Sequence, residues 1–212
     1  MALIVPVVEG PGDVAALPIL LRLILDYLQE YEIGVATPKN AHGSGNLLRP
    51  SGLEKFVEYA WRTTGAGGVL VVMDTDSPGM CPKTAAPALA SRLREVGAPR
   101  SISIVLAKTE YEVWLISSIE SIAGKTLKGS ASIDPATTAP VDCESIVNPK
   151  AWIERHFERQ STYKETLHQA AMSAYVNPVL AEQRSRSFRR LVNAIRQLVQ
   201  GIRANSRVIT PE

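Results

Sequence analysis

Cysteine and histidine are scarce in this chain of 212 residues, which contains two cysteines and three histidines. Cys81 and Cys143 lie far apart, no Cys-x-x-Cys occurs, and no histidine is spaced to complete a zinc site. Structural zinc sites need several such ligands at short spacing, so we expect no structural metal cluster. The low cysteine count also indicates a reducing compartment, and we expect a cytoplasmic protein.

Long hydrophobic runs and a strong excess of one charge are missing as well. The first residues, MALIVPVVEG, carry no basic leader and reach Glu9 too soon for a signal peptide. The apolar segment VAALPILLRLIL contains a proline and an arginine and falls short of the roughly 20 residues that cross a membrane. With 23 basic and 21 acidic residues, the chain is no polycationic nucleic-acid coat, although a local basic patch stays open.

The stretch VLVVMDTDSPG, residues 69–79, is the most informative part of the chain. Its apolar, β-branched run predicts a buried strand that ends at Asp74 and Asp76. At the carboxyl edge of a sheet these two carboxylates repel each other unless a cation lies between them. Mg²⁺ or Mn²⁺ suits such oxygen ligands. Turn formation alone also explains an Asp-x-Asp pair, because aspartate caps helices and closes turns.

Two further predicted strands end in acidic residues. The run over residues 2–8 stops at Glu9, and the glycines Gly10 and Gly12 that follow permit a tight turn and close backbone approach to a cofactor. We interpret Asp13 as the N-cap of the next helix. The strand predicted over residues 101–107 runs into a segment that contains Glu110 and Glu112.

Strands alternate with amphipathic helical segments, which predicts a doubly wound α/β fold with a parallel, Rossmann-like sheet. All carboxyl ends of such a sheet lie on one edge, so Glu9, the aspartate pair and Glu110 or Glu112 are expected to meet there. The alternative is that each acid only stabilises the N-terminus of a helix, which needs no metal.

The expected domains are an α/β domain over residues 1–125, a loop or linker over 126–148, and a helical C-terminal appendage over 149–212. Residues 38–52 are predicted to form a long loop, in which His42 is a candidate ligand or phosphate contact. Helices are predicted over 150–159, 163–174 and 185–204. Arginines concentrate near the last of these, and we name Arg184, Arg189 and Arg190 as candidate phosphate contacts. An ordinary solvated helix face explains them equally well.

The motifs Val8-Glu9-Gly10, Asp74-x-Asp76 and Glu110-Tyr-Glu112-x-Trp114 resemble a bacterial family of unknown function, DUF4276. Two C-terminal segments, Tyr163-Lys164-x-Thr166 and Ser187-Phe188-Arg189-Arg190, resemble the same family. The family is regarded as Toprim-like, akin to the nuclease half of OLD proteins and to the catalytic domains of topoisomerases and primases.

The resemblance implies a Mg²⁺-dependent phosphodiester site, with Asp74 and Asp76 as metal ligands and Glu9 as general base or metal-facing acid. It also implies nucleic acid as substrate and an ATPase partner encoded nearby in a defence-type locus. From the two C-terminal segments and the local excess of basic residues we predict that Lys164 and one or more of Arg184, Arg189 and Arg190 face the acidic site. A homo-oligomer stays open.

Two other function classes fit the same residues. An aspartyl phosphatase would use Asp74 as nucleophile and Asp76 as acid and base, although that fold usually places its nucleophile on the first strand. A catalytically silent subunit that regulates an ATPase would keep the acids without using them in chemistry.

Overall fold

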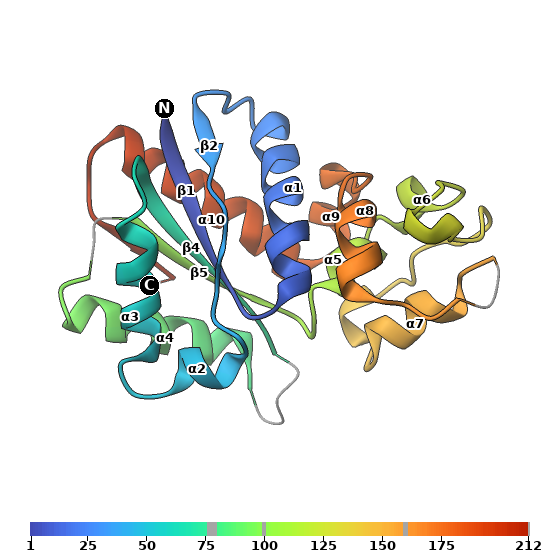
Figure 1. Ribbon diagram of the computed structural model, residues 1–212, viewed down its shortest axis with the longest axis horizontal. Coiled ribbons are helices and arrows are strands. Elements are labelled where there is room, and N and C mark those ends of the chain that lie inside the picture. The colour runs from blue at the N-terminus through green and yellow to red at the C-terminus, as the bar shows by residue number, and fades with distance from the viewer. Residues whose placement is uncertain (76–79, 99–100, 159–160, 212) are drawn as a thin grey trace.

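The computed structural model describes residues 1–75, 80–98, 101–158 and 161–211. Its centre is a parallel sheet with the strand order β2-β1-β4-β5-β6, and β3 pairs with β1 beyond the end of β2 (Figure 1). The strands are β1 (Ala2–Val8), β2 (Ile33–Val35), β3 (Lys39–Asn40), β4 (Ala66–Asp74), β5 (Ser101–Ala107) and β6 (Val208–Thr210). The predicted α/β class with a parallel sheet is confirmed.

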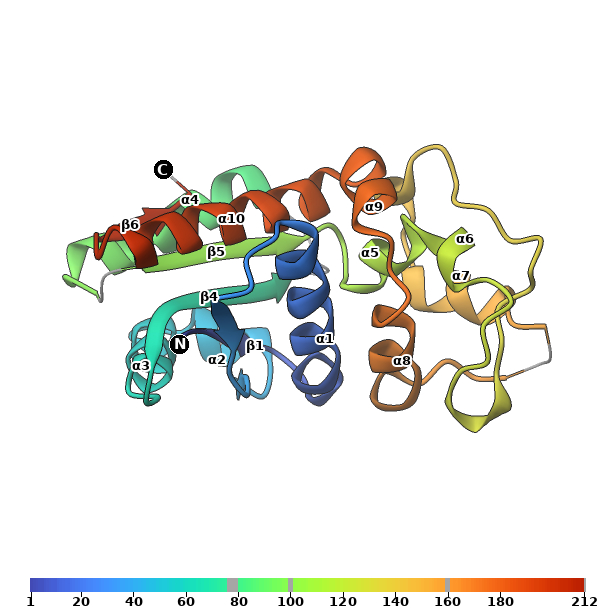
Figure 2. The same ribbon diagram turned by 90° about the horizontal axis from the view of Figure 1, so that it is seen from above.

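Helices cover both faces of this sheet and form a further group on the far side of α1 (Figures 1 and 2). They are α1 (Pro11–Tyr27), α2 (Ser44–Leu48), α3 (Gly52–Trp61), α4 (Pro82–Glu95), α5 (Glu112–Ile116), α6 (Ile119–Ile122), α7 (Pro149–Arg155), α8 (Ala170–Ser173), α9 (Pro178–Arg184) and α10 (Arg186–Arg203). A π-helical turn, Glu165–Gln169, leads directly into α8. Within the described residues, none of these helices has the length and hydrophobicity to span a bilayer.

Strands β1 and β4 show long apolar runs because helices pack on both faces of the sheet. In β1, Val5 and Val7 belong to the core formed with α3 and α4. Ile4 and Val8 point into the other core, which α1 and α10 complete. Burial on both faces therefore explains why the sequence shows runs of valine and isoleucine without polar alternation.

The chain reverses its direction of travel across the sheet between β1 and β4. After β1 it adds β2 on one side, and it later returns to place β4 on the other side of β1. Ligands of open α/β sheets bind at such a switch point, outside the carboxyl ends of the strands. Glu9 follows β1 and Asp74 ends β4, so both acids lie at this switch point.

Three local predictions need correction. Gly10, not Asp13, is the N-cap of α1, and the Asp13 carboxylate accepts a hydrogen bond from the Gly10 N–H. The second strand, which the sequence predicts over residues 33–37, ends at Val35. The predicted loop over residues 38–52 contains β3 and α2, because residues 39–40 find a partner in β1 that the local sequence does not reveal.

The C-terminal region contributes more than helices. The predicted helix over 163–174 is a π-helical turn followed by α8, and α9 precedes the predicted last helix. Strand β6 then pairs with β5, so the chain ends within the sheet region. Residues 126–148 hold two short 3-10 turns, Lys128–Ser130 and Cys143–Ser145. The boundaries of the three expected domains stay a prediction.

Candidate functional site

Hydrogen bonds from backbone N–H groups join the ends of the three central strands. The Asp74 N–H donates to Glu9 Oε1 at 2.8 Å, and the Tyr111 N–H donates to Asp74 Oδ1 at 3.0 Å. Thr75 adds a bond from its N–H to the Thr109 carbonyl at 2.7 Å. Because β1, β4 and β5 are neighbours, acids that are distant in sequence meet at one edge, as expected for parallel strands. Asp76, the second predicted ligand on β4, lies outside the described residues.

Asp13 joins this edge from the first turn of α1. Its Oδ2 accepts the Gly10 N–H at 3.2 Å and its Oδ1 accepts Gln169 Nε2 at 3.3 Å. Sequence reasoning missed Asp13 as a site residue because an acid after Gly-Pro-Gly reads as a local cap. The signal was its place on the same turn as Glu9.

Glu112 is the most deeply buried acid of the site, with 1% of its surface exposed. Its Oε1 accepts the Tyr163 hydroxyl at 2.9 Å and Gln169 Nε2 at 3.5 Å. Gln169 therefore lies between Glu112 and Asp13. Within the described residues, Glu112 Oε2 and Gln169 Oε1 are buried and have no hydrogen-bond partner. Buried polar atoms are normally paired, so these two oxygens are available to a ligand.

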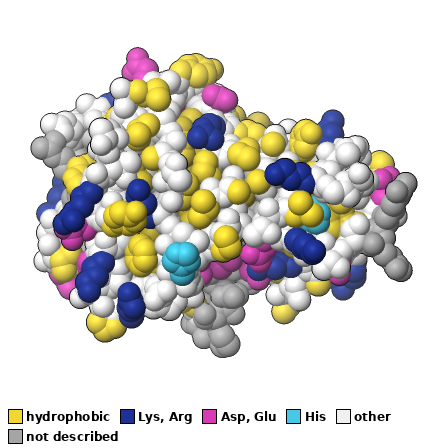
Figure 3. Space-filling model, in the orientation of Figure 1, with side chains coloured by type: hydrophobic (Ala, Val, Ile, Leu, Met, Phe, Trp, Pro, Cys, Tyr) yellow, Lys and Arg dark blue, Asp and Glu magenta, His cyan; other side chains and the backbone are white. Residues whose placement is uncertain are grey.

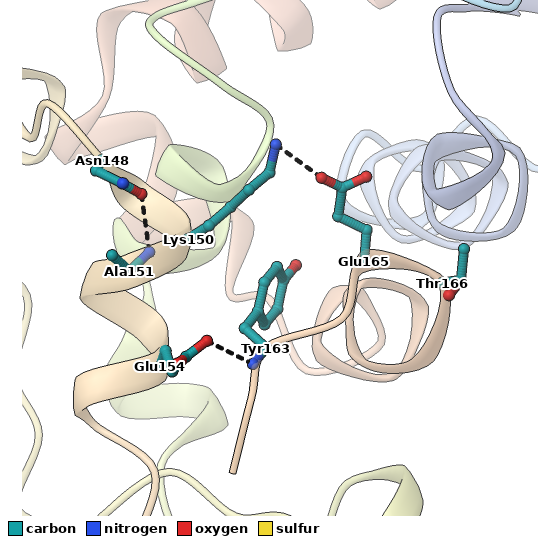
Figure 4. A pocket seen from close by; sticks show the side chains of 7 residues that line it. All are labelled: Asn148, Lys150, Ala151, Glu154, Tyr163, Glu165 and Thr166. Carbon is teal, nitrogen blue, oxygen red and sulfur yellow. Dashed lines mark hydrogen bonds and ion pairs between the residues drawn. The ribbon is translucent and has the colours of Figure 1, made fainter. Parts of the chain in front are cut away.

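Lys150, on α7, contacts two acids of this region. Its Nζ lies 2.9 Å from Glu110 Oε1 and 2.7 Å from Glu165 Oε1. Figure 4 shows Lys150 and Glu165 pointing toward each other across a cavity of about 530 Å³, with Tyr163 beside them. Burial alone would lower the pKa of Lys150, but its bonds to Glu165 and Glu110 and the charge of Glu112 raise it.

We name the carboxylates around Asp74 the acidic cluster. Its members are Glu9, Asp13, Asp74, Glu110, Glu112 and Glu165. Acidic side chains gather at the lower centre of the face in Figure 3, where the strands end in Figure 1. Glu165 comes from the π-helical turn, far along the chain from the strand ends, and α7 supplies Lys150, which pairs with Glu110 and Glu165.

Burial, and after it repulsion among these acids, raises the pKa values of three of them. Burial and then repulsion from Asp13, Glu112 and Glu9 raise the pKa of Asp74 well above its usual value. Burial raises the pKa of Asp13 to about 6 and that of Glu112 to about 7. The site therefore favours bound protons or a bound cation over free carboxylate charge.

Gly12 lets α1 approach the π-helical turn. A Cβ atom at Gly12 would lie 2.6 Å from Gln169 Oε1 and 2.9 Å from Glu165 Cβ, closer than atoms pack. The close approach predicted for the glycines is thus made to the chain's own Gln169. Gly10 serves as the N-cap that donates to Asp13.

The chemistry of the acidic cluster fits a hard divalent cation. Its donors are all oxygens, and buried oxygens of Glu110 and Glu112 have no hydrogen-bond partner among the described residues. Among the described residues, no group of three or more His, Cys, Asp or Glu side chains is arranged to hold a metal ion by itself. Mg²⁺ usually keeps several waters, so a few carboxylates suffice to hold it.

The other predicted polar residues lie outside these contacts. Lys164 is exposed, and its backbone N–H donates to His168 Nδ1 at 3.0 Å. Lys150 makes the contacts with the acidic cluster that the sequence predicts for Lys164. His42 is exposed and adjoins Gly43, whose N–H donates to the Glu9 carbonyl at 2.8 Å.

The three predicted arginines differ in their surroundings. Arg184 forms an ion pair with Glu120 at 2.7 Å, and Arg189 donates to backbone carbonyls of Glu182 and Gln183. Arg190 has a buried Nη2 atom without a hydrogen-bond partner among the described residues. Among the described residues, none of these three arginines forms an ion pair with a member of the acidic cluster.

The family model for a domain of unknown function, DUF4276, matches residues 8–196, which include every member of the acidic cluster. Among solved structures, the C-terminal region of the Burkholderia pseudomallei OLD protein resembles this chain with a TM-score of 0.40 and 17% sequence identity. That likeness covers 94% of this chain and 99% of the other. None of the curated proteins matches.

Proposed function

The chain belongs to the DUF4276 family, as its strand-end motifs predicted, and we propose that it is a metal-dependent phosphodiesterase of Toprim type that cuts nucleic acid. One observation carries the proposal: Asp74 lies at the switch point of the sheet among Glu9, Asp13 and Glu112, and burial, followed by the charges of these acids, raises its pKa. Such mutual repulsion costs stability, and a divalent cation would relieve it.

Glu9 and Asp74 would hold the Mg²⁺ or Mn²⁺ ion, and Asp76 belongs to the ligand set predicted from the sequence. A bound ion of this kind lowers the pKa of water and offsets the charge that develops on a phosphodiester. Glu9, next to Asp74 at the neighbouring strand end, would accept the proton of the attacking water.

Glu112 supplies a second proton-transfer group. Its pKa of about 7 means that it takes up and releases a proton near neutrality, which suits an acid for the leaving oxygen. Tyr163 and Gln169 fix its orientation. Lys150 holds Glu110 and Glu165 in place from α7 and balances part of the negative charge.

The proposal is tested with purified protein, Mg²⁺ or Mn²⁺, and plasmid, linear duplex, single-stranded DNA and RNA. The neighbouring ATPase predicted from the family resemblance is added in a parallel series. Glu9→Gln and Asp74→Asn should each reduce cleavage by about 100-fold or more, the range of acid–base contributions. Glu58→Gln, an exposed change on α3, is the matched control and should cut like the wild type.

Cleavage that survives both Glu9→Gln and Asp74→Asn would contradict the proposal. No cleavage of any substrate, with or without the ATPase, would favour the silent subunit. A beryllofluoride adduct on Asp74, together with hydrolysis of small phosphomonoesters, would instead identify an aspartyl phosphatase, which attacks phosphorus with its own carboxylate.

A further inference from the structure

A second cavity, of about 590 Å³, lies at the edge of β5 on the other side of the strand end from the acidic cluster. Strand β6 pairs only with Ser101–Ser103, so on the side away from β4 the second half of β5 has no neighbouring strand among the described residues. The start of α4 and the start of α10 line the cavity from opposite faces of the sheet. Figure 2 shows α4 and α10 running along β5.

Four cationic side chains line this cavity: Lys83, Lys108, Arg186 and Arg190. Among the described residues, Lys83, Lys108 and Arg190 form no ion pair, whereas several other arginines of the C-terminal region are paired. Arg190 Nη2 is buried and lacks an acceptor in the same part of the chain. An unpaired buried donor costs roughly as much as a lost hydrogen bond, so an acceptor from outside the chain would satisfy it.

One carboxylate, Glu144, also lines the cavity, and the chain itself already neutralises it. Its Oε1 accepts the Ser187 N–H at 2.6 Å and the Ser185 hydroxyl at 2.9 Å, both at the start of α10. Its Oε2 lies 3.2 Å from Arg186 Nε. The remaining three cations therefore face the cavity without a counter-charge among its described lining residues.

The floor of the cavity is apolar. Ile104 and Leu106 of β5 and Pro87 of α4 contribute to it. Pro82 opens α4, a helix of 14 residues, so backbone N–H groups and the positive end of the helix dipole also lie at this cavity. A flat apolar group attached to a phosphate matches such a site, and the volume falls within the range of small-molecule pockets.

The cavity adjoins the proposed catalytic edge. Lys108 directly follows Ala107, which pairs with Asp74 in the sheet, and Glu110 of the acidic cluster comes two residues later. A chain of nucleotides that reaches Asp74 can therefore pass Lys108 with its neighbouring phosphate.

We propose that this cavity binds one nucleotide unit: Lys83, Lys108 and Arg190 hold the phosphate, and the base lies on the apolar floor beside Leu106 and Pro87. The inference deepens the proposed function and rests on it for the choice of nucleic acid as the ligand. The same chemistry is offered by a free nucleoside monophosphate and by a nucleotide within a single strand.

Binding is measured in EDTA, so that cleavage and metal do not contribute, by fluorescence anisotropy of a labelled single-stranded decamer and by competition with nucleoside monophosphate. Arg190→Gln should weaken binding about 10-fold and reduce the slope of log affinity against log salt by about 0.7, the value for one phosphate contact on a single strand. Arg203→Gln removes one charge from the far end of α10, where Arg203 pairs with Glu30, and should leave affinity nearly unchanged.

Competition by the monophosphate identifies the cavity as a site for free nucleotides as well, whereas Arg190-dependent binding without competition assigns it to single strands. Equal losses in Arg190→Gln and Arg203→Gln, or no binding of either ligand, would overturn the inference. Thermal unfolding of each variant checks that the fold is retained. Arg190-dependent binding in a protein that cuts no substrate would refute the proposed reaction and leave the nucleotide site standing.

Discussion

Replacement of Glu112 by glutamine should stabilise the metal-free protein at alkaline pH. Burial raises the pKa of Glu112 from its ordinary value near 4.5 to about 7 in the folded chain. Between these values the folded protein binds a proton that the unfolded chain does not. Stability therefore falls as pH rises through this window, and the loss is complete above pH 7.

The size of the effect follows from the shift. Each pKa unit corresponds to about 1.4 kcal/mol, so the rise from 4.5 to about 7 corresponds to about 3 kcal/mol. Glutamine has the same shape and stays neutral at every pH. Glu112→Gln should therefore raise the free energy of unfolding by about 3 kcal/mol at pH 8 and change it little at pH 4.5.

Urea unfolding in EDTA, followed by tryptophan fluorescence at several values between pH 4.5 and 8, measures this difference. Glu120→Gln is the matched control with the opposite sign. Although burial alone would raise the pKa of Glu120, bonds from the Ala139 N–H and from Arg184 lower it. Glu120→Gln should lower the free energy of unfolding, and this decrease should be the same at pH 6, 7 and 8.

A constant difference between wild type and Glu112→Gln across this pH range would refute the reasoning. It would mean that Glu112 keeps its charge in the folded protein. Burial among the other acids would then not favour a bound proton or cation at Glu112. A further check is that saturating Mg²⁺ should stabilise the wild type more at pH 8 than at pH 5, because the cation competes with protons.

Calorimetry should show Mg²⁺ or Mn²⁺ binding to the wild type that weakens at least about 10-fold in Asp74→Asn, since one charged ligand is lost; equal affinities would contradict the site. Gly12→Ala should lower the free energy of unfolding by about 1–3 kcal/mol in urea titrations, because the new methyl group meets Gln169 and Glu165. An unchanged free energy of unfolding would mean that α1 can shift. Lys150→Gln should lower the free energy of unfolding by about 1–2 kcal/mol in urea titrations at pH 8, because Glu110 and Glu165 lose their charged partner, and an unchanged free energy would contradict that role of Lys150.

The sheet and its acidic edge could be predicted from the sequence, because both depend on short-range patterns. Continuous apolar runs over residues 2–8 and 69–73 indicate strands buried on both faces, and such strands occur in parallel sheets. Parallel strands place their carboxyl ends on one edge whatever the order of the strands. Glu9 and Asp74 therefore had to lie near one edge, and the contact between them follows because β1 and β4 are neighbours.

The rest of the site could not be predicted in this way. Gln169 is uncharged and lies in a π-helical turn, so no motif or periodicity distinguishes it from other glutamines. Lys150 and Lys164 are both lysines in predicted helices, and only the packing of α7 against the acids selects the first. Asp13 has the same sequence signature whether it caps a helix or faces a carboxylate cluster.

Only the tertiary structure decided which polar atoms are buried, paired or left without a partner. Burial of Glu112 depends on Tyr163 and Gln169, which lie more than 50 residues along the chain. Arg190 Nη2 is buried without a hydrogen-bond partner among the described residues because of where α10 begins relative to β5 and α4. Strand and helix periodicity specify which face of an element is apolar, but the choice of neighbour is a long-range packing result, and the neighbour determines the electrostatic environment of each charge.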